Sequence, residues 1–405
     1  MSQLTSPTLK RVLAGDLCSG CGLCAGVSGG AITIGESPKG YNRPVQHAPI
    51  GGAAEQAIAR GCPGSAVAPW NGAADCDPYW GPHRSISTGY ATDPELRFQA
   101  SSGGMISALL QHAIATGLVD EVIQIGAADD PTRTAVRRSA SGGEVAASAG
   151  SRYSPSSPLA FVGALLEEDR RFAFVGKPCD ASALRQLGTV DGRVAERFPI
   201  ILSFFCGGIP SHRGTQQILD DLGVAKADLA GFKYRGDGWP GFATATRRDG
   251  SSERMSYEES WGGRLSKHVQ FRCKICPDAV GGAADIACAD AWYGDESGYP
   301  QFEETDGRSL LIARTEAGAA LIDSARAAGR IETEPCPLRD IDLMQPSQAR
   351  RKRLIASRVA ALAVTAQPWP DYRGVAVAAA ARKAGFGETL KSFLGMGRRI
   401  VMGKR

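Results

Sequence analysis

Apolar residues follow two kinds of spacing along the chain, and together they predict alternating strands and helices. Short, largely apolar stretches typical of buried strands lie at 119–126, 172–176 and 200–205. Helical spacing of apolar residues runs from Ile106 towards Gly117, and a second helix is predicted from Glu316 to Ala328. Strands that alternate with helices indicate an α/β domain.

Two other stretches lack this regular spacing. Turn residues are dense over 75–82, which predicts a linker, and a new domain is expected to begin near Ser85. From about Gln345 onwards the chain is basic and helical, with Arg and Lys residues interleaved with apolar ones. We expect a solvated tail there, and we consider contact with a membrane surface as the less favoured alternative.

Composition narrows the class of protein. The chain has 405 residues, of which 43% are apolar and 22% are charged, and this composition is typical of a globular protein. Its net charge of +4 is too weak to argue for nucleic acid or membrane binding. Neither a secretory signal nor an apolar run of about 18 residues is recognised. Eleven cysteines in such a chain favour metal or redox chemistry in a reducing compartment, so a cytoplasmic location is expected.

The first cysteine motif is tightly spaced. Cys18, Cys21 and Cys24 are each three residues apart, and Cys62 precedes a proline. This arrangement resembles half of a bacterial ferredoxin and predicts one 4Fe–4S cluster on these four thiolates, with a structural zinc site as the alternative. Cys76 is interpreted as a free thiol, although a role as an alternative fourth ligand stays open.

Further cysteines follow the predicted strands. Cys179 and Cys206 come directly after the strands at 172–176 and 200–205, and Cys273 and Cys276 form a Cys-x-x-Cys pair. Ligands of open α/β sheets bind at the carboxyl ends of strands, so two such cysteines can meet at one site. Two buried core cysteines are the alternative. No role is assigned to Cys288 and Cys336.

Two loops have the composition of a phosphate or flavin site. Ser102, Gly103 and Gly104 precede a predicted helix, where backbone N–H groups can bind an anion, although this loop by itself favours a plain helix cap. The loop Ser151-Arg152-Tyr153 offers a cation for a phosphate and an aromatic ring for stacking.

The order of these motifs resembles a known family. Ser-Gly-Gly before a helix, Gly-Ser-Arg-Tyr-Ser, Gly-Lys-Pro-Cys-Asp, Phe-Phe-Cys, and then Cys-Lys-Ile-Cys with Ala-Asp-Ile occur in this sequence over about residues 85 to 345. The order is similar to that of the beta subunit family of coenzyme F420 hydrogenase/dehydrogenase, which includes the 7-hydroxymethyl chlorophyll a reductase of plants. One departure is Asp180, where the family commonly has Gln.

The resemblance implies a flavoprotein with an iron–sulfur cluster. It assigns the inner cluster to Cys179, Cys206, Cys273 and Cys276, and the flavin contacts to Ser102, Gly103, Gly104, Ser151, Arg152, Tyr153 and the backbone around Lys177. The expected fold class is mixed α/β (α+β). We expect a small ferredoxin-like 4Fe–4S domain at 1–80 and an α/β domain that binds FAD and a 4Fe–4S cluster at 81–345. A basic helical tail is expected at 346–405.

These parts together predict an oxidoreductase. Two 4Fe–4S clusters would carry electrons from a ferredoxin-type donor to FAD, and FAD would reduce a small organic acceptor. The alternative is a non-catalytic electron-transfer (beta) subunit of a larger oxidoreductase, possibly F420-linked. A nucleic-acid partner is not expected, because the basic residues lack interleaved stacking aromatics. No proton donor is assigned, although Asp290 and Asp295 are candidates by position.

Overall fold

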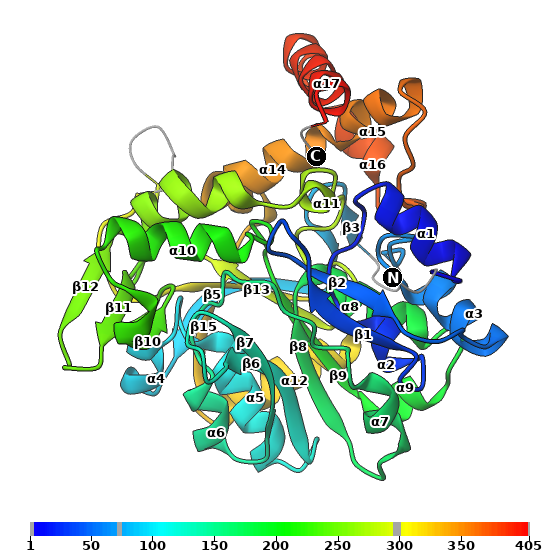
Figure 1. Cartoon of the computed structure of the whole chain (residues 1–405). Helices are drawn as coiled ribbons and strands as arrows, with labels where there is room; N and C mark the ends of the chain where they lie inside the picture. Colours follow the sequence, from blue (N-terminus) through cyan, green and yellow to red (C-terminus); the bar gives the residue numbers. More distant parts are fainter. Residues whose placement is uncertain (1–3, 71–74, 295–300, 404–405) are drawn as a thin grey trace.

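An eight-stranded mixed sheet organises the chain (Figure 1). The computed structural model describes residues 4–70, 75–294 and 301–403. In spatial order the strands are β15 (Ile331–Pro335), β5 (Ser85–Ala91), β14 (Ser309–Ala313), β13 (Ile286–Asp290), β9 (Ile200–Phe204), β8 (Phe172–Gly176), β6 (Glu121–Ala127) and β7 (Thr134–Ser139). The predicted α/β class is confirmed.

The centre of the sheet is parallel. β13 pairs with β9, β9 with β8, and β8 with β6, all in parallel register. These strands are buried along nearly their whole length, as expected for a sheet covered on both faces. The predicted strands at 119–126, 172–176 and 200–205 are β6, β8 and β9, and they are confirmed within two residues.

Helices cover both faces of this sheet. On one face α5 (Met105–Ala115) and α12 (Glu316–Ala327) bury apolar side chains against β9, β13 and β14. On the other face α7 (Val162–Glu167) and α8 (Pro178–Leu187) pack against β6 and β8. The short helices α4 (Pro94–Gln99), α6 (Gly142–Ala147) and α9 (Arg193–Arg197) complete these layers. The two helices predicted from apolar spacing are α5 and α12.

A smaller three-stranded sheet lies beside the main one. It consists of β10 (Leu229–Lys233), β11 (Ala243–Arg247) and β12 (Ser252–Met255), and α10 (His212–Asp221) packs on it. A π-helical turn at Glu258–Arg264 and a short 3-10 turn lead from this sheet to α11 (Phe271–Lys274). The Cys-x-x-Cys pair thus lies directly after this small sheet.

Residues 4–70 pack on the main domain. Their elements are α1 (Pro7–Ala14), α2 (Leu23–Gly26), β1 (Ile32–Glu36), β2 (Asn42–Gln46) and α3 (Gly52–Gly61). α3 contacts α8, and Leu23 belongs to the same buried cluster as the residues of β8. The linker expected at 75–82 is instead a hairpin of β3 (Asp75–Asp77) and β4 (Gly81–His83) within the described residues. The Asp77 carboxylate accepts the N–H groups of Tyr79 and Trp80 and closes this turn.

The basic C-terminal region is folded. It contains α13 (Ile341–Met344), α14 (Pro346–Arg353), α15 (Ile355–Val364), α16 (Val377–Ala381) and α17 (Phe386–Val401). The expectation of a solvated tail is therefore wrong for α14 and α15, where Lys352, Ile355 and Leu362 are buried. Apolar residues between the basic ones explain the difference, because they pack against the N-terminal segment. No helix in the described ranges is long and apolar enough to cross a membrane.

Candidate functional site

Four cysteines of the N-terminal segment converge, and we call them the outer cysteine set. Cys18 and Cys21 lie between α1 and α2, Cys24 is in α2, and Cys62 directly follows α3. Burial raises the pKa of each thiol, and neighbouring thiols raise the pKa of Cys21, Cys24 and Cys62 further. Cys18 acts on Cys62, and Cys18, Cys21 and Cys62 all act on Cys24. The pKa of Cys62 reaches about 12.

Backbone N–H groups surround the sulfurs of the outer cysteine set. The Cys18 sulfur accepts from the N–H of Gly20, the Cys21 sulfur from Leu23, and the Cys24 sulfur from Ala25. The Cys62 sulfur accepts from the N–H groups of Gly64 and Ser65. The loop has this shape because Gly22 adopts a φ of +88°, and a Cβ there would lie 2.8 Å from the Ala160 nitrogen. Amide donors aimed at buried thiolates suit the electron-rich sulfurs of an iron–sulfur cluster.

The other four predicted ligands also converge, and we call them the inner cysteine set. Cys179, Cys206, Cys273 and Cys276 line one small cavity at the carboxyl ends of the parallel strands β8 and β9. The Ile209 N–H donates to the Cys273 sulfur at 3.4 Å. Burial, followed by the neighbouring Cys273, raises the pKa of Cys206 to about 12. A set of thiols this closely coupled would be stabilised as thiolates by bound metal.

Arg272 and Gln270 connect the two cysteine sets. The buried Arg272 guanidinium donates through Nη2 to the Pro63 carbonyl at 2.9 Å, next to Cys62, and it also lines the inner cavity. The Gln270 amide donates to the Ser19 carbonyl at 3.3 Å and to the Cys273 sulfur at 3.8 Å. Residues adjacent to the outer ligands thus touch residues adjacent to the inner ones.

Two buried donors at the inner cavity lack a partner among the described residues. They are Nη1 of Arg272 and the hydroxyl of Ser19. An anionic sulfur-bridged cluster would satisfy both, because an unpaired buried donor is costly. In the described part of the chain no group of three or more His, Cys, Asp or Glu side chains has the geometry for a metal ion. The four-thiol sets and their amide donors fit 4Fe–4S clusters.

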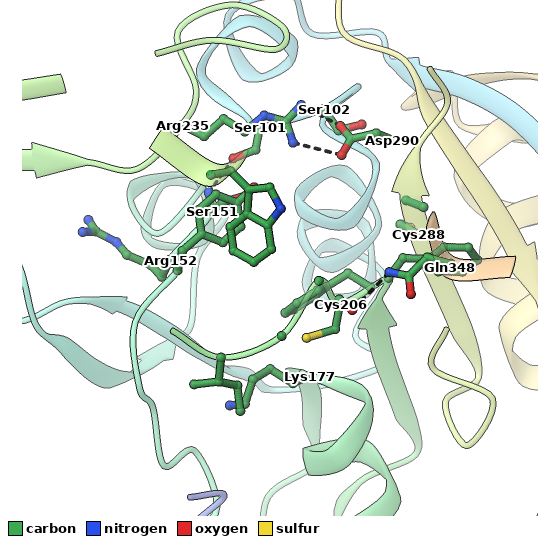
Figure 2. A pocket seen from close by; sticks show the side chains of 18 of the residues that line it. Ser101, Ser102, Ser151, Arg152, Lys177, Cys206, Arg235, Cys288, Asp290 and Gln348 are labelled. Atoms are coloured by element: carbon green, nitrogen blue, oxygen red, sulfur yellow. Dashed lines mark hydrogen bonds and ion pairs between the residues drawn. The ribbon is translucent and has the colours of Figure 1, made fainter. Parts of the chain in front are cut away.

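A much larger cavity, of about 830 Å³, adjoins the inner cavity, and we call it the strand-end cavity. Cys206, Gly208, Ile209, Cys273 and Arg351 line both spaces. The size is that of a site for a cofactor or a drug-sized ligand. Figure 2 shows Cys206 and Lys177 on one side of this space and Arg235 and Asp290 on another.

The predicted flavin loops meet at the strand-end cavity. Its lining includes Ser102, Gly104, Ser151, Arg152, Tyr153 and Lys177. The Ser151 N–H donates to the Ser101 hydroxyl and joins the two loops (Figure 2). Gly103 is not among the lining residues: a Cβ there would lie 2.7 Å from the Gly89 carbonyl oxygen, so this glycine is needed for packing against β5.

The side chains of Arg152 and Lys177 both have protein partners. Arg152 donates to the carbonyls of Pro131 and Phe232, and burial lowers its pKa. In Figure 2 its guanidinium points away from Cys206 and Asp290. Lys177 forms a buried ion pair with Asp180 at 2.7 Å, and the Lys177 N–H donates to the same carboxylate. Burial lowers the pKa of Lys177, but Asp180 outweighs this effect and the net pKa is raised.

A group of aromatic residues around Arg235 was missed from the sequence. Arg235 donates two hydrogen bonds to Asp290, at 2.7 and 2.9 Å, and lies over the rings of Tyr257 and Trp292. Trp239 also donates to Asp290 and stacks on Trp292. The density of aromatics near Asp290 was the available signal. The Asp290 carboxylate is therefore held by two side chains, Arg235 and Trp239. The other candidate, Asp295, lies outside the described residues.

The three remaining cysteines belong to neither set. Cys288 is buried on β13 and lines the strand-end cavity, and burial raises its pKa to about 12. Cys76 is exposed on β3, and Cys336 follows β15.

Comparison with known proteins identifies relatives of the whole central domain. Two family models match the chain, both described as coenzyme F420 hydrogenase/dehydrogenase, beta subunit: the N-terminal model covers residues 86–162 and the C-terminal model covers 169–338. The coenzyme F420 hydrogenase subunit beta of Methanosarcina barkeri is 27% identical over 64% of this chain and 84% of that protein. The same subunit of Methanothermobacter thermautotrophicus is 23% identical over 72% of this chain and 99% of that protein.

Two further relatives extend the comparison. The F420-dependent formate dehydrogenase 1 subunit beta of Methanococcus maripaludis is 24% identical over 60% of each chain. A chain of the F420-reducing [NiFe] hydrogenase complex from Methanosarcina barkeri has a similar fold, with a TM-score of 0.54 and 21% identity over 70% of this chain and 94% of that chain. The two family models lie side by side on the domain that holds the inner cysteine set and the strand-end cavity. The chain therefore belongs to the coenzyme F420 hydrogenase/dehydrogenase beta subunit family, a family of oxidoreductase subunits.

Proposed function

We propose that the chain is an iron–sulfur flavoprotein that passes electrons from a ferredoxin-type donor through two 4Fe–4S clusters and FAD to a small organic acceptor. The observation that carries this proposal is the wall shared by the inner cavity and the strand-end cavity. Cys206 and Cys273 line both spaces, so a cluster on the inner cysteine set would lie next to a flavin in the larger one. Family membership supports redox chemistry at this site.

Some residues of the chain would bind the cofactors, and others would form the wall of the site where the acceptor binds. The outer and inner cysteine sets would each hold a cluster, and the joined loops at Ser101 and Ser151 would hold the flavin. Clusters transfer single electrons and the flavin links them to two-electron chemistry. Arg235, fixed by Asp290, would hold the aromatic wall of Tyr257 and Trp292 in place and exclude water beside the flavin.

An alternative is an electron-transfer subunit without an acceptor reaction of its own. The relatives are beta subunits of F420 hydrogenases and F420-dependent formate dehydrogenases, so a partner oxidoreductase subunit is a specific possibility here. Size-exclusion chromatography of the purified chain, followed by assays with reduced ferredoxin and candidate acceptors including F420, separates the two functions. Acceptor reduction by the isolated chain supports the first function, and activity only after addition of a partner supports the second.

The cofactor content is tested by anaerobic purification. We expect about eight irons, about eight acid-labile sulfides and one flavin per chain, which corresponds to two 4Fe–4S clusters and one isoalloxazine. A protein without labile sulfide contradicts the proposal, and a zinc-containing colourless protein supports the structural alternative.

Cysteine variants test the two sets separately. Cys21→Ser and Cys276→Ser should each lower the iron content by about half, with the flavin retained. Cys336→Ser is the matched control, because Cys336 lies outside both sets. Equal iron content in all three variants would contradict the assignment.

A further inference from the structure

Helix α17 carries two separate apolar faces. One face is formed by Met396 and Ile400, which are 5% and 9% exposed and belong to the same buried cluster as Ala361 and Leu362 of α15. This face accounts for the attachment of the helix to the body. In Figure 1, α17 (red) rises beyond α15 and α16, and most of its length stands clear of the main sheet domain.

The second apolar face is largely exposed to solvent. Phe386, Leu390, Leu394 and Val401 are 84%, 44%, 59% and 82% exposed. At 3.6 residues per turn, these four positions fall within a sector of about 80° beside the buried face. Gly397 lies in the same sector, so no polar side chain interrupts the stripe. A continuous stripe of large exposed apolar side chains is typical of an interaction surface.

Positive charge borders this apolar stripe. Lys391 and Arg398 lie next to it on the side away from the body, and both are exposed. Between residues 382 and 403 the chain has five Lys or Arg residues and one acidic residue, Glu388. Glu388 is already paired with Arg350 at 2.6 Å. The surface around the stripe is therefore cationic.

The positive field extends to the helices below. Burial, and then the neighbouring Arg351, Arg350 and Arg399, lower the pKa of Arg358 to about 10. Like charges are thus crowded at the base of α17, and Arg350 among them is paired with Glu388.

The partner must accept large apolar side chains and must carry negative charge next to the Lys and Arg residues of this projecting helix. Anionic lipid bilayers have this chemistry: acyl chains accept Phe, Leu and Val, and headgroup phosphates lie at the level of the Lys and Arg residues. The family models end at residue 338, so α17 lies outside the part of the chain matched to the hydrogenase and dehydrogenase beta subunits. We propose that α17 binds the surface of an anionic membrane through Phe386, Leu390 and Leu394, with Lys391 and Arg398 at the headgroups.

Vesicle flotation of the full chain tests this proposal under anaerobic conditions. The protein should associate with vesicles of phosphatidylglycerol and phosphatidylcholine at least about tenfold more than with phosphatidylcholine vesicles. High salt should reduce the association, because the headgroup attraction is screened. A protein that stays in solution with both kinds of vesicle would overturn the proposal and leave a protein partner as the occupant of the stripe.

Two variants locate the binding surface. The triple variant Phe386→Ser, Leu390→Ser and Leu394→Ser should lose most of the association, whereas Phe161→Ser should keep it, since Phe161 is 61% exposed at the start of α7. Equal binding by these two variants would overturn the proposal. Lys391→Gln with Arg398→Gln should weaken binding to the anionic vesicles and leave the fold intact, so it provides an independent test if the triple variant does not fold. Binding unchanged by this charge variant would also count against the proposal.

Discussion

Arg272 places a buried cation between the two halves of the proposed electron path. Its guanidinium is bonded to the Pro63 carbonyl on the outer side and lines the inner cavity, where Nη1 has no partner among the described residues. We expect Arg272→Met to lower the reduction potential of the inner centre by roughly 50–100 mV, because a nearby cation stabilises the added electron. A redox titration followed by electron paramagnetic resonance measures this shift.

The control for this prediction keeps the charge. Arg272→Lys should shift the potential much less than Arg272→Met, even though it loses the forked hydrogen bond to Pro63. Similar potentials in wild type and Arg272→Met would show that the guanidinium serves packing alone.

His212 makes stability depend on pH at a position remote from the cysteines. Burial, followed by Arg133, lowers its pKa to about 4, and its ring bonds to the Ser154 hydroxyl at 3.2 Å. The unfolded chain binds more protons at this group between pH 4 and about 6.5, so its contribution is complete above pH 6.5 and is lost as the pH falls towards 4. The contribution to the unfolding free energy is at most about 3 kcal/mol.

Urea unfolding across pH 4.5 to 7.5 tests this dependence. His212→Gln should lose less stability than wild type on acidification, because the group that titrates is gone. His47→Gln removes an exposed histidine and should follow the wild-type curve. Parallel curves for His212→Gln and wild type would contradict the prediction.

Individual residues differ in how far their roles could be predicted. The sequence grouped the outer four cysteines by their spacing and the inner four by strand ends and the family resemblance, and each group lines one region of the structure. Arg235 was not identified, because its contacts with Asp290 and Trp292 join segments 55 and 57 positions apart. Arg152 was assigned to a phosphate from its loop alone, yet its guanidinium is bonded to two backbone carbonyls.

At the scale of single elements, α5 depends on the glycine that precedes it. Gly104 is its N-cap, with a φ of +74°, and a Cβ there would lie 3.1 Å from the Ala91 Cβ. Gly104→Ala should cost about 1–2 kcal/mol from the left-handed backbone alone and should lower flavin content by displacing the adjacent Ser102 loop. Flavin absorbance per chain and the thermal midpoint measure both effects.

Gly143→Ala is the matched control for this element. Gly143 lies inside α6, where an added Cβ would meet no atom within 4 Å, so the change should be neutral or slightly stabilising. Unchanged flavin content in Gly104→Ala would contradict the role given to this turn.

Elements were predicted best where the chain is uniformly buried. β8 and β9 form short apolar runs and were found nearly to the residue, whereas β13 (Ile286–Asp290) was missed because its Ala, Cys and Asp residues are weak strand signals. The hairpin of β3 and β4 was predicted as a linker, because the same turn-forming residues are common in hairpin turns and in linkers.

Across the whole molecule, the C-terminal helices stabilise the N-terminal cysteine loop. Leu362 of α15 is fully buried in the cluster that also contains Cys18, Ile275 and Met396. Leu362→Ala should lower the unfolding free energy by about 2–5 kcal/mol through the cavity it leaves. Because Leu362 and Cys18 share this buried cluster, iron bound by the outer set should be lost first on warming.

The neighbouring Val364 provides the comparison. It is 71% exposed, so Val364→Ala should change stability by no more than about 0.5 kcal/mol. Iron release and the thermal midpoint, measured together, report on both variants. Similar losses in the two variants would show that α15 does not support the outer set.

Apolar runs and glycine-rich turns were enough to predict the fold class, because they are local properties that the backbone translates directly into loops and strands. Cysteine spacing likewise defined the groups of thiols on which the proposed chemistry rests. Which of these local features meet was established by tertiary packing alone. The inner cysteine set is assembled from the first turn of α8, the residues after β9, and α11 with the residues that follow it. Arg272 brings this set into contact with Pro63, and the C-terminal helices pack over Cys18 instead of remaining in solvent. Contacts between segments more than 200 residues apart, such as that of Arg272 with Pro63, depend on how whole layers pack, and no local pattern contains that information.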